Sequence, residues 1–229
     1  MGPGPGMPAS ASSGGGPAIR GFTQGTMTSG SSSLTVSLPV GSASGDYAVI
    51  QIGSAYGISG VCSGVACANS WTYLDSNPRS CISGNDFYRT LTSGDVSTGT
   101  VTTTASGAYG GGIALTVFVG THSAQSSYNQ YIAGGLNTTS WPVSGAAVTT
   151  TGATVGLWFF VTRQSGTPTL LSSLGTQQGT QTDNSGVGTV SYAQAIPSST
   201  IITPTFSSSN LSDGGCGGSS WAVDEVVVQ

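Results

Sequence analysis

The sequence predicts an all-β protein, a single antiparallel β-sandwich or jelly-roll-like domain that follows an extended N-terminal arm. Over residues 33–38 (SLTVSL), leucine and valine alternate with serine and threonine, the period of a strand with one buried face. Residues 46–52 (DYAVIQI) are almost wholly apolar after the aspartate, which is typical of a strand inside a sandwich. We expect these two strands to pair with each other. Short runs of this kind recur between Gly/Ser/Pro-rich turns, and no window has a helical period.

The N-terminal residues 1–17 (MGPGPGMPASASSGGGP) have the composition of a flexible arm rather than of a helix or strand. We therefore divide the chain into this arm and one β-sandwich domain over residues 18–229. If the arm is ordered, we expect a neighbouring subunit to hold it.

The strands of the domain are expected from local patterns, taken in chain order. The first part of the chain predicts strands at residues 19–28, 33–38, 46–52, 71–74, 87–91, 98–104 and 113–119. An Asp-Ser-Asn-Pro turn over 75–78 is expected to end the fourth. Residues 122–142 are interpreted as a long loop with at most one short strand. Further strands are expected at 147–151, 155–162, 187–196, 200–206 and 221–228, with 155–162 in a central position.

The composition excludes several classes of function. Only 5% of the 229 residues are charged, against about 25% in ordinary soluble domains. The four basic residues are all arginine and the net charge is −4. A nucleic-acid-binding face needs several cations, so we expect no nucleic-acid partner. A surface of hydroxyls and amides carries little charge repulsion and suits a subunit that packs among copies of itself.

The sequence also bears on location. The N-terminus lacks the basic start and apolar stretch of a signal peptide. No apolar run approaches the roughly 20 residues that cross a bilayer, so we expect no membrane partner. A protein of this kind that works outside cells would leave them by lysis or within a larger particle.

Five segments in this order resemble a known family: SLTVSLPVGSASGDYAVIQI, WTYLD, DFYRTLTSGD, GGIALTVFVG and SSWAVDEVVVQ. They are similar to β-sandwich modules of tailed-bacteriophage virion proteins, of the capsid decoration or fibre type, that also occur in some bacterial surface proteins. The resemblance spans most of residues 18–229 and departs from the pattern at 60–82 and 122–142. It implies a structural or attachment role on a virion, with other capsid or tail proteins as partners and no cofactor.

The four cysteines admit more than one state, and three disulfide connectivities are possible among them. A bridge within the C-x4-C pair would leave the other two to meet, and free buried thiols are the alternative. A zinc site would need C-x2-C spacing and usually histidine, so we expect no metal. The candidates for disulfides are Cys62, Cys67, Cys81 and Cys216.

Few residues could take part in catalysis, and we expect that the protein is not an enzyme. His122 is the only histidine and is interpreted as a surface-loop residue, because catalytic triads need spatial geometry that the adjacent Ser123 does not supply. The acids are spread along the chain, and contexts such as Ser-Gly-Asp95 favour hydrogen bonds to turn backbone. An extracellular hydrolase with two facing carboxylates stays the alternative.

The best candidate binding surface combines flat aromatic rings with amide side chains, in the stretch that ends at Trp141. Such groups suit the apolar faces and polar edges of sugars. Tyrosine and tryptophan are also enriched at subunit interfaces, so we favour the interpretation in which these residues cap the end of the sandwich or fill a subunit interface. The residues of this surface are Tyr128, Tyr131, Asn137 and Trp141.

These observations together predict a structural virion protein located on the particle surface, which assembles through its sandwich and its N-terminal arm. The alternative is an adhesin or receptor-binding module that recognises a glycan of the host surface.

Overall fold

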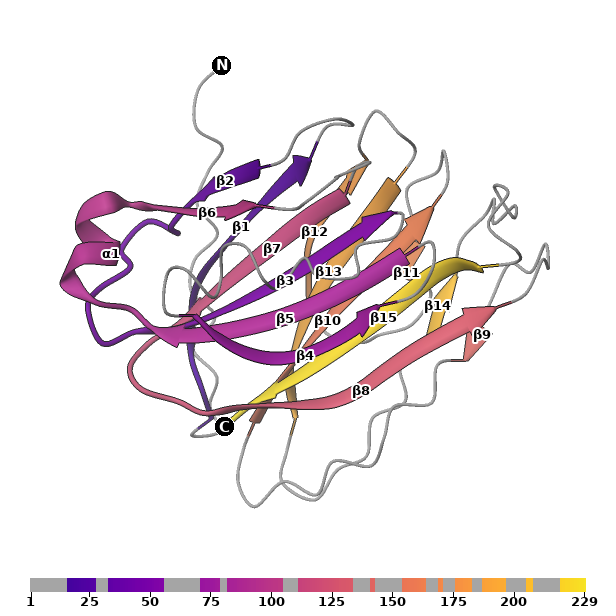
Figure 1. The fold of residues 1–229 in the computed structure, drawn as a ribbon. Coiled ribbons are helices and arrows are strands. Elements are labelled where there is room, and N and C mark those ends of the chain that lie inside the picture. Colours follow the sequence, from indigo (N-terminus) through magenta and orange to yellow (C-terminus); the bar gives the residue numbers. More distant parts are fainter. Residues whose placement is uncertain are drawn as a thin grey trace.

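A computed structural model of the chain shows an all-β protein (Figure 1). Every strand pair that it describes is antiparallel, and one short helix accompanies the strands in the described part. The residues that the structure describes are 16–27, 33–55, 71–78, 82–104, 111–133, 141–142, 154–163, 169–170, 176–182, 187–196, 205–207 and 219–229.

The first large sheet is built from the N-terminal half of the chain. Its five strands lie in the order β1 (Ile19–Met27), β7 (Gly111–Phe118), β3 (Tyr47–Ala55), β5 (Ile82–Thr90) and β4 (Thr72–Pro78). The central strand β3 contains the apolar run of residues 47–50 and pairs with β5 and β7 on its two sides.

The second large sheet is built mostly from the C-terminal half. Its strands lie in the order β12 (Thr176–Thr182), β13 (Val187–Ile196), β10 (Thr154–Arg163), β15 (Ser219–Val228) and β8 (Ala124–Ala133). The apolar strand β10 holds the central place that the sequence predicts for it. Two small sheets complete the described strands: β2 (Ser33–Ser37) with β6 (Thr100–Thr104), and β11 (Thr169–Leu170), β14 (Thr205–Ser207) and β9 (Trp141–Pro142).

One apolar cluster joins the two large sheets. Tyr47 and Val49 of β3 and Phe118 of β7 lie in it together with side chains of β10 and β15. The partners from the second sheet are Val155, Leu157, Val226 and Val228, all buried. Because burial of apolar surface is the main stabilising term in folding, this cluster helps to hold strands of the two sheets together.

A second cluster lies on the opposite face of the first sheet. There, the alternate residues Ala48, Ile50 and Ile52 of β3 pack beneath Val36 of β2 and Val101 of β6. The first sheet is therefore covered on both faces, by the second sheet and by the β2–β6 ribbon. This double cover explains why all eight residues of β7 are buried.

The ribbon can lie close to the sheet because β1 has a glycine beneath it. A Cβ atom at Gly25 would lie 2.8 Å from Val36 Cγ1 and 3.2 Å from Leu34 Cδ1, both on β2. The absence of a side chain at this position therefore sets how closely the two layers approach.

The helix α1 (Ser93–Thr98) joins β5 to β6 and lies at the left of Figure 1. Thr92 is its N-cap and forms a capping box with Asp95, while Gly99 ends it with a left-handed φ of 68°. The backbone N–H of Leu38 donates to the Gly99 carbonyl at 2.9 Å, which ties the end of the helix to the chain that follows β2.

Four expectations are corrected by the structure. The segments 33–38 and 46–52 are both strands but do not pair, because β2 pairs with β6 and lies over the sheet that contains β3. The expected turn at 75–78 continues β4. The expected loop at 122–142 contains the ten-residue strand β8, which pairs with β15 although its sequence is largely polar. The helix α1 was not expected, because six residues are too few to show a helical period.

Other expectations lie outside the described residues, among them most of the arm, the strand at 147–151 and all four cysteines. In the part of the chain that is described, no helix has the length and apolar character needed to cross a bilayer.

Candidate functional site

Within the described residues, polar side chains gather in two constellations, and neither of them was predicted from the sequence as a site. One is centred on Asp46, at the end of the molecule where β1 and β3 begin and β7 ends. The other is centred on Arg89 and Asp95, beside α1.

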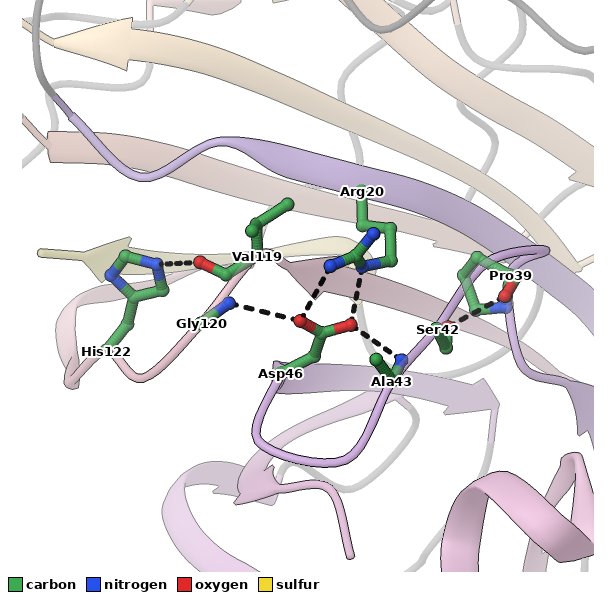
Figure 2. Close-up of polar contacts among 8 residues, drawn as sticks. All are labelled: Arg20, Pro39, Ser42, Ala43, Asp46, Val119, Gly120 and His122. Carbon is green, nitrogen blue, oxygen red and sulfur yellow. Dashed lines mark hydrogen bonds and ion pairs between the residues drawn. The ribbon is translucent and has the colours of Figure 1, made fainter. Parts of the chain in front are cut away.

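Asp46 is a buried carboxylate that receives N–H groups from three separate segments (Figure 2). Its Oδ1 accepts from Arg20 Nη2 at 3.0 Å and from the Gly120 N–H at 3.1 Å. Its Oδ2 lies 2.5 Å from Arg20 Nε and accepts from the Ala43 N–H at 2.7 Å. The carboxylate thus joins the start of β1, the loop before β3 and the loop after β7.

The backbone of Asp46 adds a fourth segment to this junction. Its carbonyl accepts from the Leu91 N–H at 2.8 Å, and the Leu91 carbonyl accepts from the Gly45 N–H at 2.8 Å. Gly45 and Gly120 have φ values of 94° and 80°, a region of backbone conformation that favours glycine. These two turns therefore depend on having glycine at those positions.

The electrostatics of Asp46 follow from these contacts. Burial alone would raise the pKa of its carboxyl group, but the hydrogen bonds from Arg20, Gly120 and Ala43 and the charge of Arg20 outweigh burial and lower that pKa. The side chain of Asp46 is 4% exposed. A carboxylate with four N–H neighbours and almost no exposed surface is suited to holding loops rather than to accepting a proton from a substrate.

His122 lies next to this junction and is tied to the fold. Its Nε2–H donates to the Val119 carbonyl at 2.8 Å, and its ring packs edge-on against Tyr47 and Phe118 with centroid separations of 6.2 and 6.0 Å. With Nε2 acting as a donor, that nitrogen has no lone pair for a base. The interpretation of His122 as a loop residue is confirmed, but the ring is only partly exposed.

Tyr47 forms the apolar side of the same region. Its ring stacks on Tyr88 at a centroid separation of 5.6 Å and is 2% exposed. Burial, together with the neighbouring Tyr88 phenol, raises the pKa of Tyr47 well above its ordinary value. The phenol is therefore neutral at physiological pH and acts as a packing group.

The second constellation lines a cleft of about 340 Å³ beside α1 and β6. Arg89 Nη1 and Asp95 Oδ1 lie 3.3 Å apart there. Asp95 Oδ2 accepts from the backbone N–H and from the hydroxyl of Thr92, both at 2.7 Å, so the capping box fixes the carboxylate. The prediction that Asp95 bonds to turn backbone is confirmed.

Sequence signals existed for part of this cleft. Thr92-Ser-Gly-Asp95 has the spacing of a capping box, which would have placed a helix start there. No local pattern brings Trp71 or Arg89 to the same place, because they lie on segments that only the sheet joins.

The predicted binding surface is described only in part. The backbone of Tyr128 and Tyr131 lies in β8, opposite Glu225 and Ala222 of β15. Trp141 lies in β9, opposite Phe206, in a different sheet. Asn137, Cys62, Cys67, Cys81 and Cys216 lie outside the described residues. The structure therefore places the two tyrosines on one strand, and the roles of all these residues stay predictions.

Within the described residues, no group of three or more His, Cys, Asp or Glu side chains gathers as metal ligands would. Comparison with family models, with curated proteins and with solved structures finds no match for this chain.

Proposed function

We propose that the protein is a non-catalytic structural subunit of a tailed-bacteriophage virion, a capsid decoration or fibre protein. In this proposal the two large sheets form a β-sandwich that packs against other subunits, and residues 1–17 form an arm that latches onto a neighbour. The resemblance of five segments to virion modules supports the virion context. The arrangement of the charged side chains supports the structural role.

The observation that carries the proposal is that the ion pairs in the described part of the chain join separate elements of the fold. Arg20 pairs with Asp46 and Arg89 pairs with Asp95, and each pair joins a strand to a loop or helix. Asp86 is 1% exposed and lies opposite Gln51 in the β3–β5 register. A hydrolase of the glycosidase type would instead need two carboxylates that face an open cleft.

Assembly through uncharged surfaces is consistent with this use of charge. A chain with 5% charged residues has few groups left for repulsion between copies. Contacts between such copies would rest on shape, hydroxyl groups and backbone hydrogen bonds, and they would depend little on salt.

The test compares the complete chain with a chain that begins at residue 18. We expect the complete chain to form discrete oligomers or to be incorporated into particles. The shortened chain should give the same circular dichroism spectrum but stay monomeric in sedimentation velocity. Equal assembly by both chains would refute the latch, and a strictly monomeric complete chain at tens of micromolar would refute self-assembly.

A second candidate function is recognition of a host-surface glycan. The observation that favours it is that Tyr128 and Tyr131 lie on β8, which is an edge strand of its sheet. Edge strands have a neighbouring strand of their sheet on one side only. In this case, Tyr131→Ala and Trp141→Ala should each abolish adsorption to host cells while a glycan array identifies the sugar. Unchanged adsorption by both variants would rule this role out.

A further inference from the structure

The cleft beside α1 is a hollow in the described part of the chain, and its lining side chains converge from several elements. Trp71 precedes β4, Arg89 comes from β5, and Asp95 comes from α1. Thr100 and Thr102 of β6 form another part of its wall. The volume of about 340 Å³ is near the lower end of the range of ligand pockets, so the cleft suits a ligand with one ring.

The charges in this cleft select for a neutral ligand. Arg89 and Asp95 are its ionic residues and their formal charges cancel. An anion such as a phosphate would be attracted by Arg89 but repelled by the neighbouring Asp95, and a cation would be attracted by Asp95 but repelled by Arg89. A hydroxyl group can both donate to a carboxylate and accept from a guanidinium, so it matches both groups at once.

The acidic side of the pair is held in place before any ligand arrives. Thr92 binds Asp95 Oδ2 through its backbone N–H and its hydroxyl, which leaves Oδ1 as the oxygen that faces Arg89. Both side chains of the pair are about one-fifth exposed, 19% for Arg89 and 21% for Asp95. A ligand that enters therefore contacts side chains that the fold already holds in place, so binding loses little side-chain entropy.

The remaining lining supplies what a sugar ring needs besides its polar contacts. Trp71 and Val101 are 6% and 7% exposed and provide an apolar floor. Thr100, which is exposed, places a hydroxyl group at the wall. A sugar ring has apolar C–H faces and hydroxylated edges, so it can lie on the floor while its hydroxyls reach the ionic pair and the threonines.

We propose that this cleft is a binding site for one neutral saccharide ring. Arg89 and Asp95 would hold adjacent hydroxyl groups, Trp71 and Val101 would contact an apolar face, and Thr100 would provide a further hydrogen bond. The site goes beyond the structural role proposed above and does not depend on it. It is also separate from the surface around Tyr128 and Tyr131, because it is built from the first sheet, α1 and β6.

The direct experiment is a titration of the complete ¹⁵N-labelled chain, followed by amide and indole chemical shifts. The probes are glucose, galactose and N-acetylglucosamine, with glucose 6-phosphate as the charged comparison. We expect at least one neutral sugar to give saturable shifts at the Trp71 indole and the Thr100 amide, with a Kd of about 1–10 mM for a ligand of this size. The phosphorylated sugar should bind no more tightly.

Two variants of Thr100 locate the binding. Thr100→Val keeps the β-branched shape and removes the hydroxyl, and it should weaken binding about three- to tenfold, the value of one hydrogen bond. Thr100→Phe should abolish binding by filling the cleft while suiting an exposed strand position. Thr121→Val, at an exposed threonine of the loop after β7, is the matched control and should bind as the unchanged chain does.

Three results would overturn the proposal. One is the absence of saturable shifts with all three neutral sugars. Another is a set of shifts confined to β8, which would support the tyrosine surface instead. The third is unchanged binding by both Thr100 variants whose amide spectra show an intact fold.

Discussion

Asp46 shows how one side chain can join segments that are far apart in the sequence. It receives N–H groups from Arg20, Ala43 and Gly120, and its own carbonyl binds Leu91. Removing one partner from a buried ion pair is costly, because the other charge is left uncompensated. The stability of this end of the molecule should therefore depend on the charge of a single carboxylate.

We expect Asp46→Asn to lower the free energy of unfolding by about 2–3 kcal/mol at pH 7. Because the pKa of Asp46 is lowered in the folded state, its contribution is fully present above the unfolded value near 3.8. It is lost as the pH falls through the lowered folded value. Urea unfolding between pH 7 and pH 2 should thus show a smaller acid-dependent loss in the variant than in the unchanged chain.

The control for this prediction is a double-mutant cycle with Arg20→Gln. If the two residues act as a pair, the double variant should be more stable than the sum of the two single effects implies. Additive effects, or an acid-dependent loss in Asp46→Asn equal to that of the unchanged chain, would show that the junction is held by other contacts.

At the scale of elements, the β2–β6 ribbon depends on Gly25 beneath it. A Cβ atom there would approach Val36 Cγ1 to 2.8 Å, so Gly25→Ala should destabilise the protein by about 1–3 kcal/mol through overpacking. The matched control is Gly94→Ala in α1, where the nearest atom, Thr92 Oγ1, lies at an ordinary 3.6 Å. Since alanine favours helices, that variant should be neutral or more stable by up to about 1 kcal/mol.

Both variants are measured by urea unfolding at pH 7. Equal stabilities for the two would mean that the ribbon can shift away from the sheet at little cost, and that the outer apolar cluster does not depend on close approach.

The elements that sequence predicts well are those whose apolar pattern is carried by the strand itself. The strands expected at 46–52, 113–119 and 155–162 are of this kind, and they correspond to β3, β7 and β10. Strand β8 has no such pattern, and it is a strand because β15 offers it a pairing edge. For the same reason, the pairing partners of a strand cannot be predicted from its local sequence pattern. This is why β2 was not expected to pair with β6.

The candidate sites follow the same division. Asp95 could be predicted to bond to turn backbone, because Thr92 and Asp95 are close in sequence. The contact of Asp46 with Gly120 crosses 74 residues, and the cleft joins Trp71 and Arg89 to β6, so both depend on the topology of the sheet. Sites formed by long-range contacts can be identified only once the fold is known.

At the scale of the whole molecule, the first sheet is enclosed between the second sheet and the β2–β6 ribbon. The described ion pairs tie the loop before β3 and the helix α1 to strands of this sheet. Together with the low charge of the chain, this arrangement is consistent with the building unit of a particle that we propose. That the particle is a virion stays a proposal, which rests on the resemblance of five sequence segments to virion modules.

The most direct test of this account is cryo-electron microscopy of tailed particles isolated from the source that carries this gene. The account predicts density for the two stacked five-stranded sheets on the particle surface, with the N-terminal residues in contact with a neighbouring subunit. Particles that lack the protein, together with a purified chain that is monomeric and turns over a substrate, would contradict it.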